Sequence, residues 1–310
     1  MPSFHDDTIL SSDGKTNLRV RQCLPDGTPK AVVQIAHGIA EHVERYDDFA
    51  AFLAAHGFVV VANDHLGHGK SISAPENQGF FAEEGGWETV VRDMRRVYER
   101  THADFPELPY FLFGHSMGSF LTRTYLIRYR DGLSGAVLSG TGQQPGAVVA
   151  GGFAMGQREV KKRGARYVSE KLNNMAFGNY TKGIEPLRTA SDWLSRDEAV
   201  VDRYLADPLC GFIPTAGLFR DMMHGIAFNQ NQKNVARMKK DLPVYFMSGD
   251  RDPVGANGKG VMRAYQSFLK AGMSDVTLKL YSGGRHEMLN ELNRDEVYED
   301  VLKWFESKLK

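Results

Sequence analysis

The sequence predicts an α/β fold built on a mostly parallel, doubly wound sheet. Short apolar runs alternate with longer amphipathic patterns along most of the chain, which is typical of βα units. The runs are apolar at successive positions, as expected of strands that are buried on both faces of a parallel sheet. The alternation stops between residues 141 and 231, which predicts an insertion without strands.

Six short segments rich in β-branched and aromatic residues are the predicted strands of this sheet. They are residues 31–36, 58–62, 110–113, 135–138, 244–247 and 276–281. The first residues, about 4–20, predict an antiparallel hairpin with Asp13-Gly14 at its turn. Apolar residues recur three and four positions apart in the stretches between, and helices are expected there, over residues 46–56, 87–100, 120–129, 260–269 and 297–309.

The insertion is interpreted as a helical cap, residues 141–231, above a core made of residues 1–140 and 232–310. Ser195 and Glu198 match a capping box that opens a helix reaching about residue 206, where Pro208 ends it. A second helical pattern spans residues 215–228. Residues 145–156 are apolar and rich in glycine.

Composition excludes several classes of protein. The formal net charge is zero, so no attraction of the whole chain to nucleic acid is expected. The two cysteines, Cys23 and Cys210, provide neither a disulfide framework nor zinc-site spacing. The first residues lack a signal-peptide pattern, and no apolar run is long enough to span a bilayer. A cytoplasmic protein without metal or cofactor is expected, and the oligomeric state is left open.

The motif Gly114-His115-Ser116-Met117-Gly118 follows a predicted strand and precedes a predicted helix. This is the context of a nucleophile elbow, in which a serine projects from a tight turn at the end of a strand. Ser116 is therefore the candidate nucleophile. The N–H of Met117 is one candidate oxyanion donor, and the N–H of Ile39, in the loop after the strand 31–36, is the second.

A serine nucleophile needs a histidine base and a carboxylate that orients it. In this kind of elbow the chain order is serine, acid, histidine. Only His224 and His286 follow Ser116, and His286 is favoured because it lies in the loop after a late strand. The acid is expected after the strand 244–247, where Asp250 and Asp252 compete and spacing alone does not choose between them.

The chain resembles the monoacylglycerol lipase, lysophospholipase and serine aminopeptidase S33-type branch of the α/β-hydrolase superfamily. The resemblance starts near residue 30 and reaches the end. It is carried by residues 37–42, by the D-x-x-G-H-G-x-S turn at 64–71, by the elbow, by the G-x-x-D loop at 249–252 and by residues 285–291. It implies the α/β-hydrolase fold with a helical cap, and the catalytic role of the fourth residue of G-x-x-D falls on Asp252. It also marks Asp64 and His68, which are interpreted as structural.

Mono-acyl lipid esters are the substrates that this resemblance implies. A carboxylesterase on short or non-lipid esters, a peptidase and a non-catalytic binding protein are the alternatives. Ile39 stands where relatives often have a small residue, and its bulk is expected to narrow the acyl entrance. A basic cluster on the cap suggests transient contact with a membrane or micelle, although a solvated face is the simpler explanation; its members are Arg158, Lys161, Lys162, Arg163 and Arg166. The candidate substrate-binding residues are His37, His115, Phe153, Met222 and Met223.

Overall fold

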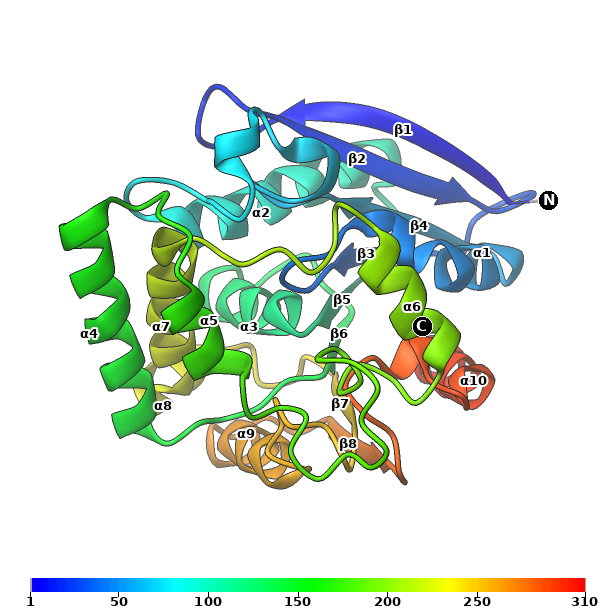
Figure 1. Ribbon diagram of the computed structural model, residues 1–310. Coiled ribbons are helices and arrows are strands. Elements are labelled where there is room, and N and C mark those ends of the chain that lie inside the picture. The colour runs from blue at the N-terminus through cyan, green and yellow to red at the C-terminus, as the bar shows by residue number, and fades with distance from the viewer. Residues whose placement is uncertain (1, 310) are drawn as a thin grey trace.

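A computed structural model describes residues 2–309 and places eight strands in one sheet of order β1-β2-β4-β3-β5-β6-β7-β8 (Figure 1). β3 to β8 run parallel, while the β1–β2 hairpin adds to β4 in antiparallel fashion. The predicted α/β-hydrolase architecture is thus confirmed. The strands are β1 Ser3–Leu10, β2 Asn17–Leu24, β3 Ala31–Ala36, β4 Phe58–Asn63, β5 Tyr110–His115, β6 Gly135–Ser139, β7 Val244–Gly249 and β8 Val276–Tyr281.

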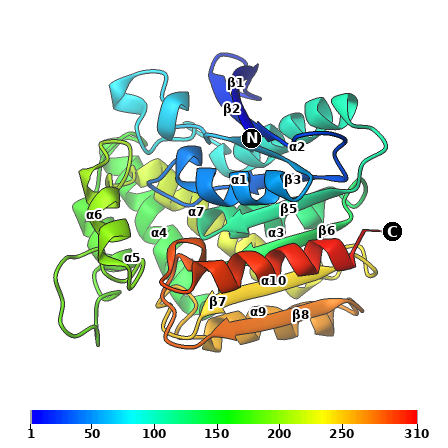
Figure 2. The ribbon, with the colours of Figure 1, turned by 90° about the vertical axis from the view of Figure 1, so that its right-hand side faces the viewer.

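Helices cover both faces of the sheet. Successive strand residues point to opposite faces, so Val32 packs in one core cluster with Met94, and Val33 packs in the other with Phe49. Figure 2 shows the two layers, with α1 and α10 in front of the sheet. These helices are α1 Asp47–Ala55 and α10 Arg294–Ser307 on one face, and α2 Gly86–Asp104, α3 Met117–Arg128 and α9 Lys259–Lys270 on the other.

The insertion between β6 and β7 is helical, and no strand occurs in residues 141–231 apart from one isolated bridge between Val168 and Thr215. α7 packs on α2 and α3 of the core, and α4 packs on the outer side of α7 (Figure 1). The division into a core and a separate cap stays a prediction. The helices of this part are α4 Gly146–Arg163, α5 Glu170–Phe177, α6 Glu198–Ala206, α7 Ala216–Gln230 and the short α8 Gln232–Val235.

Two helices of the insertion differ from what local sequence suggests. The glycine-rich stretch begins α4, although each glycine inside a helix costs about 1 kcal/mol relative to alanine. Close packing explains it, because a Cβ on Gly156 would lie 3.1 Å from the Cα of Arg220 in α7. α6 is capped by Asp197, whose carboxylate accepts from the first backbone N–H groups. Ser195, the expected cap, instead donates its hydroxyl to the carbonyl of Asn290.

The parallel strands all end at one edge of the sheet, where open α/β folds bind their ligands. The loops after β3, β5, β7 and β8 meet there under the helices of the insertion (Figure 1). No helix within residues 2–309 is long and apolar enough to cross a membrane.

Candidate active site

Ser116 forms the turn between β5 and α3. Its φ of 52° and ψ of −121° lie outside the usual regions for a non-glycine residue, and such strain costs of the order of 1–3 kcal/mol. The N–H of Ser116 donates to the carbonyl of Ser139 in β6, which holds the turn. Gly118 must lack a side chain, because a Cβ there would lie 2.0 Å from the carbonyl oxygen of Ala36 in β3. The sharp turn leaves the serine side chain at the sheet edge.

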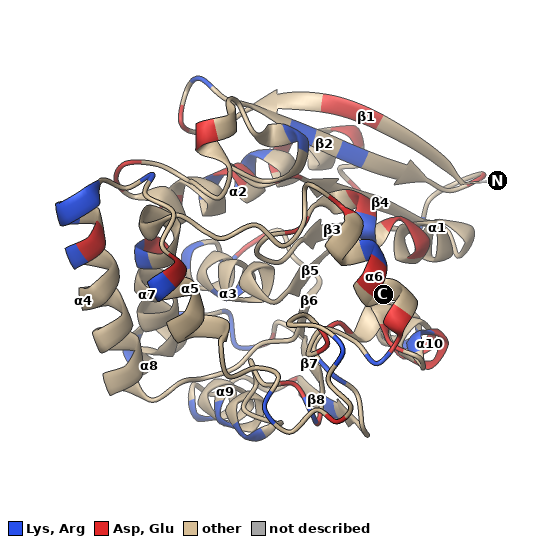
Figure 3. Cartoon of the chain, in the orientation of Figure 1, with Lys and Arg blue, Asp and Glu red and all other residues tan. Residues whose placement is uncertain are grey.

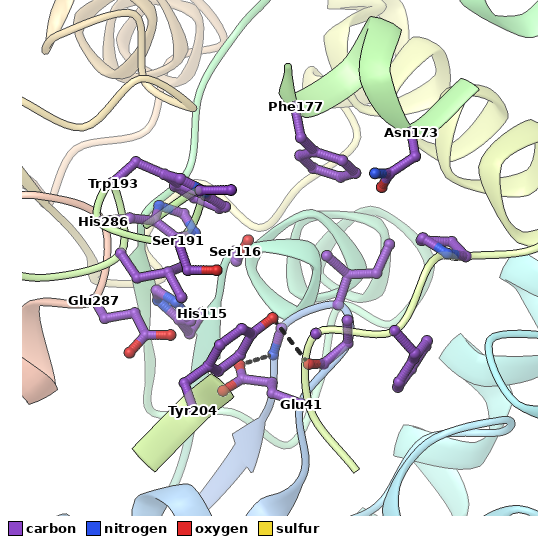
Figure 4. A pocket seen from close by; sticks show the side chains of 18 of the residues that line it. Glu41, His115, Ser116, Asn173, Phe177, Ser191, Trp193, Tyr204, His286 and Glu287 are labelled. Carbon is purple, nitrogen blue, oxygen red and sulfur yellow. Dashed lines mark hydrogen bonds between the residues drawn. The ribbon is translucent and has the colours of Figure 1, made fainter. Parts of the chain in front are cut away.

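His286 and Asp252 form a buried pair beside Ser116. The His286 Nδ1 lies 3.0 Å from Asp252 Oδ1, and Asp252 also accepts from the Ser248 hydroxyl at 2.9 Å and the Val254 N–H at 2.9 Å. With Nδ1–H donating to the carboxylate, the neutral imidazole keeps its lone pair on Nε2. Nε2 is buried and has no hydrogen-bond partner among the described residues. Ser116 and His286 line the same pocket (Figure 4).

Electrostatics favours the charged forms of both partners. Burial alone would lower the pKa of His286, but the charge and the hydrogen bond of Asp252 raise it above its ordinary value. Burial alone would raise the pKa of Asp252, but the charge of His286 and the hydrogen bonds hold it below its ordinary value. The imidazole is therefore a stronger base than a free histidine. The Nε2 atom can accept a proton, and the Asp252 carboxylate would then stabilise the imidazolium that results.

The competing acid, Asp250, points elsewhere. Its carboxylate accepts from the N–H of Gly283 at 2.8 Å and lies 4.0 Å from Arg251. Asp250 therefore ties two loops together, while Asp252 is the carboxylate that contacts His286. His224, the alternative base, is exposed on α7 and lies 6.1 Å, between ring centroids, from Phe153.

The loop after β3 runs directly against Ser116, since a Cβ on Gly38 would lie 3.1 Å from the Cβ of Ser116. Buried Glu41 fixes this loop by accepting from the Gly38 N–H at 2.5 Å and from the Tyr46 hydroxyl at 2.8 Å. The Ile39 N–H donates no hydrogen bond to any residue from 2 to 309. Met117 is the first residue of α3, and the first N–H groups of a helix have no acceptor inside the helix.

Arg45 connects this loop to the histidine loop. Its guanidinium donates to the Glu41 carboxylate at 2.6 Å and to both carboxylate oxygens of Glu287, each at 2.6 Å. Because Glu287 directly follows His286, Arg45 connects the loop after β3, which carries Ile39, to the loop that carries His286. Burial alone would raise the pKa of Glu41, but the charge of Arg45 lowers it. The two carboxylates and one guanidinium leave one net negative charge.

The turn at residues 64–71 has a structural role. Buried Asp64 accepts from the backbone N–H groups of Val43 and Lys70, at 2.9 and 2.8 Å. The ring of His68 donates to its own turn at the carbonyl of Leu66, and burial lowers the pKa of His68 to about 4. The ring of His37 packs 4.1 Å from that of His65, and the His37 Nε2 accepts from the His65 N–H. These rings pack behind the loop that carries Gly38 and Ile39, and the His37 Nδ1 bonds the Gly38 carbonyl at 2.7 Å.

Two pockets meet at Ser116. A polar pocket of about 250 Å³ is lined by Glu41, His115, Asn173, Ser191, Tyr204 and Glu287, which Figure 4 shows around Ser116. An apolar pocket of about 450 Å³ lies under α4, α5 and α7 and is lined by Phe120, Met155, Met175, Phe219, Met222 and Met223. Four residues line both, namely Ile39, Ser116, Phe177 and Trp193.

The structure brings three of the five candidate substrate-binding residues to these pockets. His115 lines the polar pocket, and Met222 and Met223 line the apolar one. His37 lines neither, because its ring faces the buried histidines, and Phe153 lines neither, because it falls on the outer face of α4.

Four further residues line the polar pocket that the sequence does not single out, namely Phe177, Trp193, Tyr204 and Glu287. They converge from the insertion and the histidine loop, and no local spacing signals that. The position of Glu287 beside His286 was the one available hint.

One group of described residues has the donor atoms of a metal site. The ligand atoms of His42, Asp207 and Cys210 lie within 4.8 Å of one another. Asp207 accepts from His42 Nε2 at 2.8 Å, whereas the buried Nδ1 of His42 has no hydrogen-bond partner among the described residues. The group joins the loop before α1 to the segment after α6.

A family model described as serine aminopeptidase, S33, matches residues 27–293. The chain belongs to this family. It is 30% identical to a monoglyceride lipase of Mus musculus over 308 residues, 97% of this chain and 90% of the relative. It is 32% identical to a monoacylglycerol lipase of Mycolicibacterium smegmatis over 290 residues, 92% of this chain and 91% of the relative.

Among solved structures, a thermostable carboxyl esterase from Bacillus coagulans in complex with glycerol superposes with a TM-score of 0.93 at 29% identity. The superposition covers 99% of both chains. The fold, the family and the catalytic class agree: this S33-family chain is a serine hydrolase of the lipase and esterase type, and its chemistry is the hydrolysis of esters.

Proposed function

We propose that the enzyme hydrolyses monoacylglycerols and related mono-acyl esters of a small uncharged alcohol. Ser116 attacks the ester carbonyl while His286 takes its proton at Nε2, and Asp252 stabilises the imidazolium. The N–H groups of Ile39 and Met117 receive the negative charge on the carbonyl oxygen. The alcohol leaves with the proton from His286, and water then releases the fatty acid by the same steps in reverse.

The meeting of an apolar and a polar pocket at Ser116 carries this proposal. The apolar pocket, rich in methionine, suits a flexible acyl chain, because unbranched thioethers adapt to irregular apolar ligands. The polar pocket, on the other side of the serine, suits an alcohol with hydroxyl groups to pair. Asn173, Asn174 and Ser191 offer amide and hydroxyl groups for that purpose.

The charge of the polar pocket favours a glycerol ester over a lysophospholipid. The described lining residues of this pocket include Glu41 and Glu287 but no lysine or arginine. A phosphate brought to this site would meet carboxylates rather than the cations that normally bind it. The apolar pocket likewise favours long acyl chains over short ones, since burying each methylene contributes about 0.8 kcal/mol.

We also propose brief contact with lipid surfaces through the insertion. Val148 is 60% exposed and Met175 is 42% exposed, and both line the apolar pocket, so its rim is apolar on the outside. The other end of α4 carries exposed Lys161, Lys162 and Arg163 (Figure 3). Arg166 is less available, because it pairs with Glu83 and lies over the ring of Phe80.

Active-site variants and a substrate series test the proposal together. Ser116→Ala is expected to lose roughly six powers of ten in kcat and all labelling by a fluorophosphonate probe. Asp252→Asn is expected to cost about four powers of ten, because the wrong tautomer results, whereas Asp250→Asn leaves kcat within about tenfold. The wild type should hydrolyse monoacylglycerols faster than the lysophospholipids of the same acyl chain.

Specific results would contradict these assignments. Turnover by Ser116→Ala at the wild-type rate would exclude the serine mechanism. Equal losses in Asp250→Asn and Asp252→Asn would exclude the assignment of the acid. A preference for acetyl esters, or for lysophospholipids, would replace the proposed substrate class while keeping the triad.

A further inference from the structure

The polar pocket combines aromatic rings with carboxylates. Phe177, Trp193, Tyr204 and Phe212 line it together with the two glutamates. Asn173 and Ser191 can pair with the hydroxyl groups of a polyol, but the four aromatic rings add a surface that such an alcohol does not use. Aromatic faces beside carboxylates are the surroundings that quaternary ammonium groups prefer, since such a cation binds the negative face of a ring and has no N–H to donate.

The charge of the pocket has the sign that a cation requires. Glu41 and Glu287 line the pocket, whereas Arg45, which they share, does not. The Arg45 guanidinium lies against the ring of Tyr204, 4.9 Å from its centroid, and lines a separate cavity beyond that ring. One negative charge therefore remains on the pocket side. No lysine or arginine among the described lining residues competes with a bound ammonium group.

The rings are placed at the alcohol side of the nucleophile. The rings of Phe177 and Trp193 are nearly parallel, 13° apart, with centroids separated by 6.4 Å. Trp193 also lies 5.0 Å from the ring of His286, the group that would protonate the leaving alcohol. Figure 4 shows Trp193, Phe177, Tyr204 and Glu287 around the space in front of Ser116.

We propose that the enzyme also hydrolyses acyl esters of quaternary-ammonium alcohols, the acylcholine class, and that the polar pocket binds their cationic head. The inference rests on the proposed ester hydrolysis and extends its alcohol side. The bond between the acyl carbon and the choline oxygen breaks, and His286 delivers its proton to that oxygen. Water then cleaves the acyl-serine, so the products are one fatty acid and one choline.

Octanoylcholine and neohexyl octanoate provide the test, because the second replaces the quaternary nitrogen by carbon at the same size. The kcat/KM for the choline ester should exceed that for its neutral isostere by about tenfold, the effect of a desolvated cation–π contact. Tetramethylammonium should inhibit hydrolysis of neohexyl octanoate competitively, at concentrations where neopentyl alcohol does not. This arm uses the wild type and needs no variant to fold.

Variants then assign the preference to the pocket. Glu287→Gln and Trp193→Leu should each lower the ratio of kcat/KM values between the two esters by about threefold or more. Phe153→Leu and Glu299→Gln are matched controls on the outer faces of α4 and α10, and they should leave the ratio unchanged. The ratio separates head recognition from any general loss of catalysis.

The outcomes distinguish the two proposals. Equal kcat/KM for both esters, together with no inhibition by tetramethylammonium, overturns the inference while ester hydrolysis stands. No hydrolysis of either ester or of monoacylglycerols, with no labelling of Ser116, overturns the proposed function itself. A preference that persists in both pocket variants also overturns the inference, because the cation would then bind elsewhere.

Discussion

Replacing Arg45 by methionine tests whether the buried ion network holds the site together. The guanidinium makes three short hydrogen bonds to two carboxylates, which are 3% and 4% exposed. Methionine fills much of the volume but leaves both carboxylates without their cation. Breaking a buried pair in this way costs about 3–5 kcal/mol. The control Arg95→Met removes a partly exposed pair with Glu99 and should cost less than about 1 kcal/mol.

The pH dependence of the loss identifies its cause. In the wild type, Arg45 holds the pKa of Glu41 below its ordinary value, so the pair stabilises the fold at neutral pH and loses that effect as acid protonates the carboxylate. In Arg45→Met, the charge that lowers the pKa of Glu41 is lost while the burial that raises it remains, so an ionised Glu41 destabilises the fold increasingly as pH rises. The stability deficit of the variant should therefore be larger at pH 8 than at pH 5.

Urea unfolding at the two pH values, with kcat measured beside it, gives the result. The kcat of Arg45→Met should fall by about tenfold to a hundredfold, because the loop of Ile39 and the loop of His286 lose their common tie. A deficit below 1 kcal/mol at pH 7, or an equal deficit at pH 5 and pH 8, would refute this reasoning.

Two further predictions concern acid and lipid. Burial lowers the pKa of His68 to about 4 in the folded protein, whereas the unfolded chain keeps a histidine pKa near 6.5. Acid therefore protonates the unfolded chain first, and the free energy of unfolding falls by roughly 2 kcal/mol between pH 7 and pH 5. His68→Asn should therefore lose about 2 kcal/mol less than the wild type over this interval in urea titrations, and identical losses would exclude the explanation. Sedimentation with anionic vesicles should show binding that weakens as salt rises and that decreases in Lys161→Glu/Lys162→Glu. Absent binding, or binding that does not change with salt, would exclude the proposed contact with lipid surfaces.

The parts of the site that a local pattern encodes could be predicted from sequence. The elbow at Ser116 needs a strand, two glycines and a helix within one short stretch, and all of these are visible in the chain. The pairing of His286 with Asp252 followed from chain order and from the family pattern, and the structure brings the two into contact. Their catalytic roles stay proposals.

Long-range contacts explain what sequence could not provide. Arg45 and Glu287 are separated by 242 positions, and no local pattern around either residue predicts that the two form an ion pair. α4 is helical because Gly156 packs on α7, which outweighs the poor helix propensity of glycine. The orientations of His37 and Phe153 likewise depend on which neighbours each side chain meets after folding.

The insertion is bonded to the loop that carries His286, and backbone carbonyls of the insertion accept these bonds. The carbonyls of Trp193 and Leu194 accept from the N–H groups of His286 and Glu287, and Arg285 reaches the carbonyls of Asp192 and Ser195. Any opening that lifted residues 192–195 would displace His286 with them. A graft of this insertion onto another hydrolase would therefore have to carry residues 285–291 along.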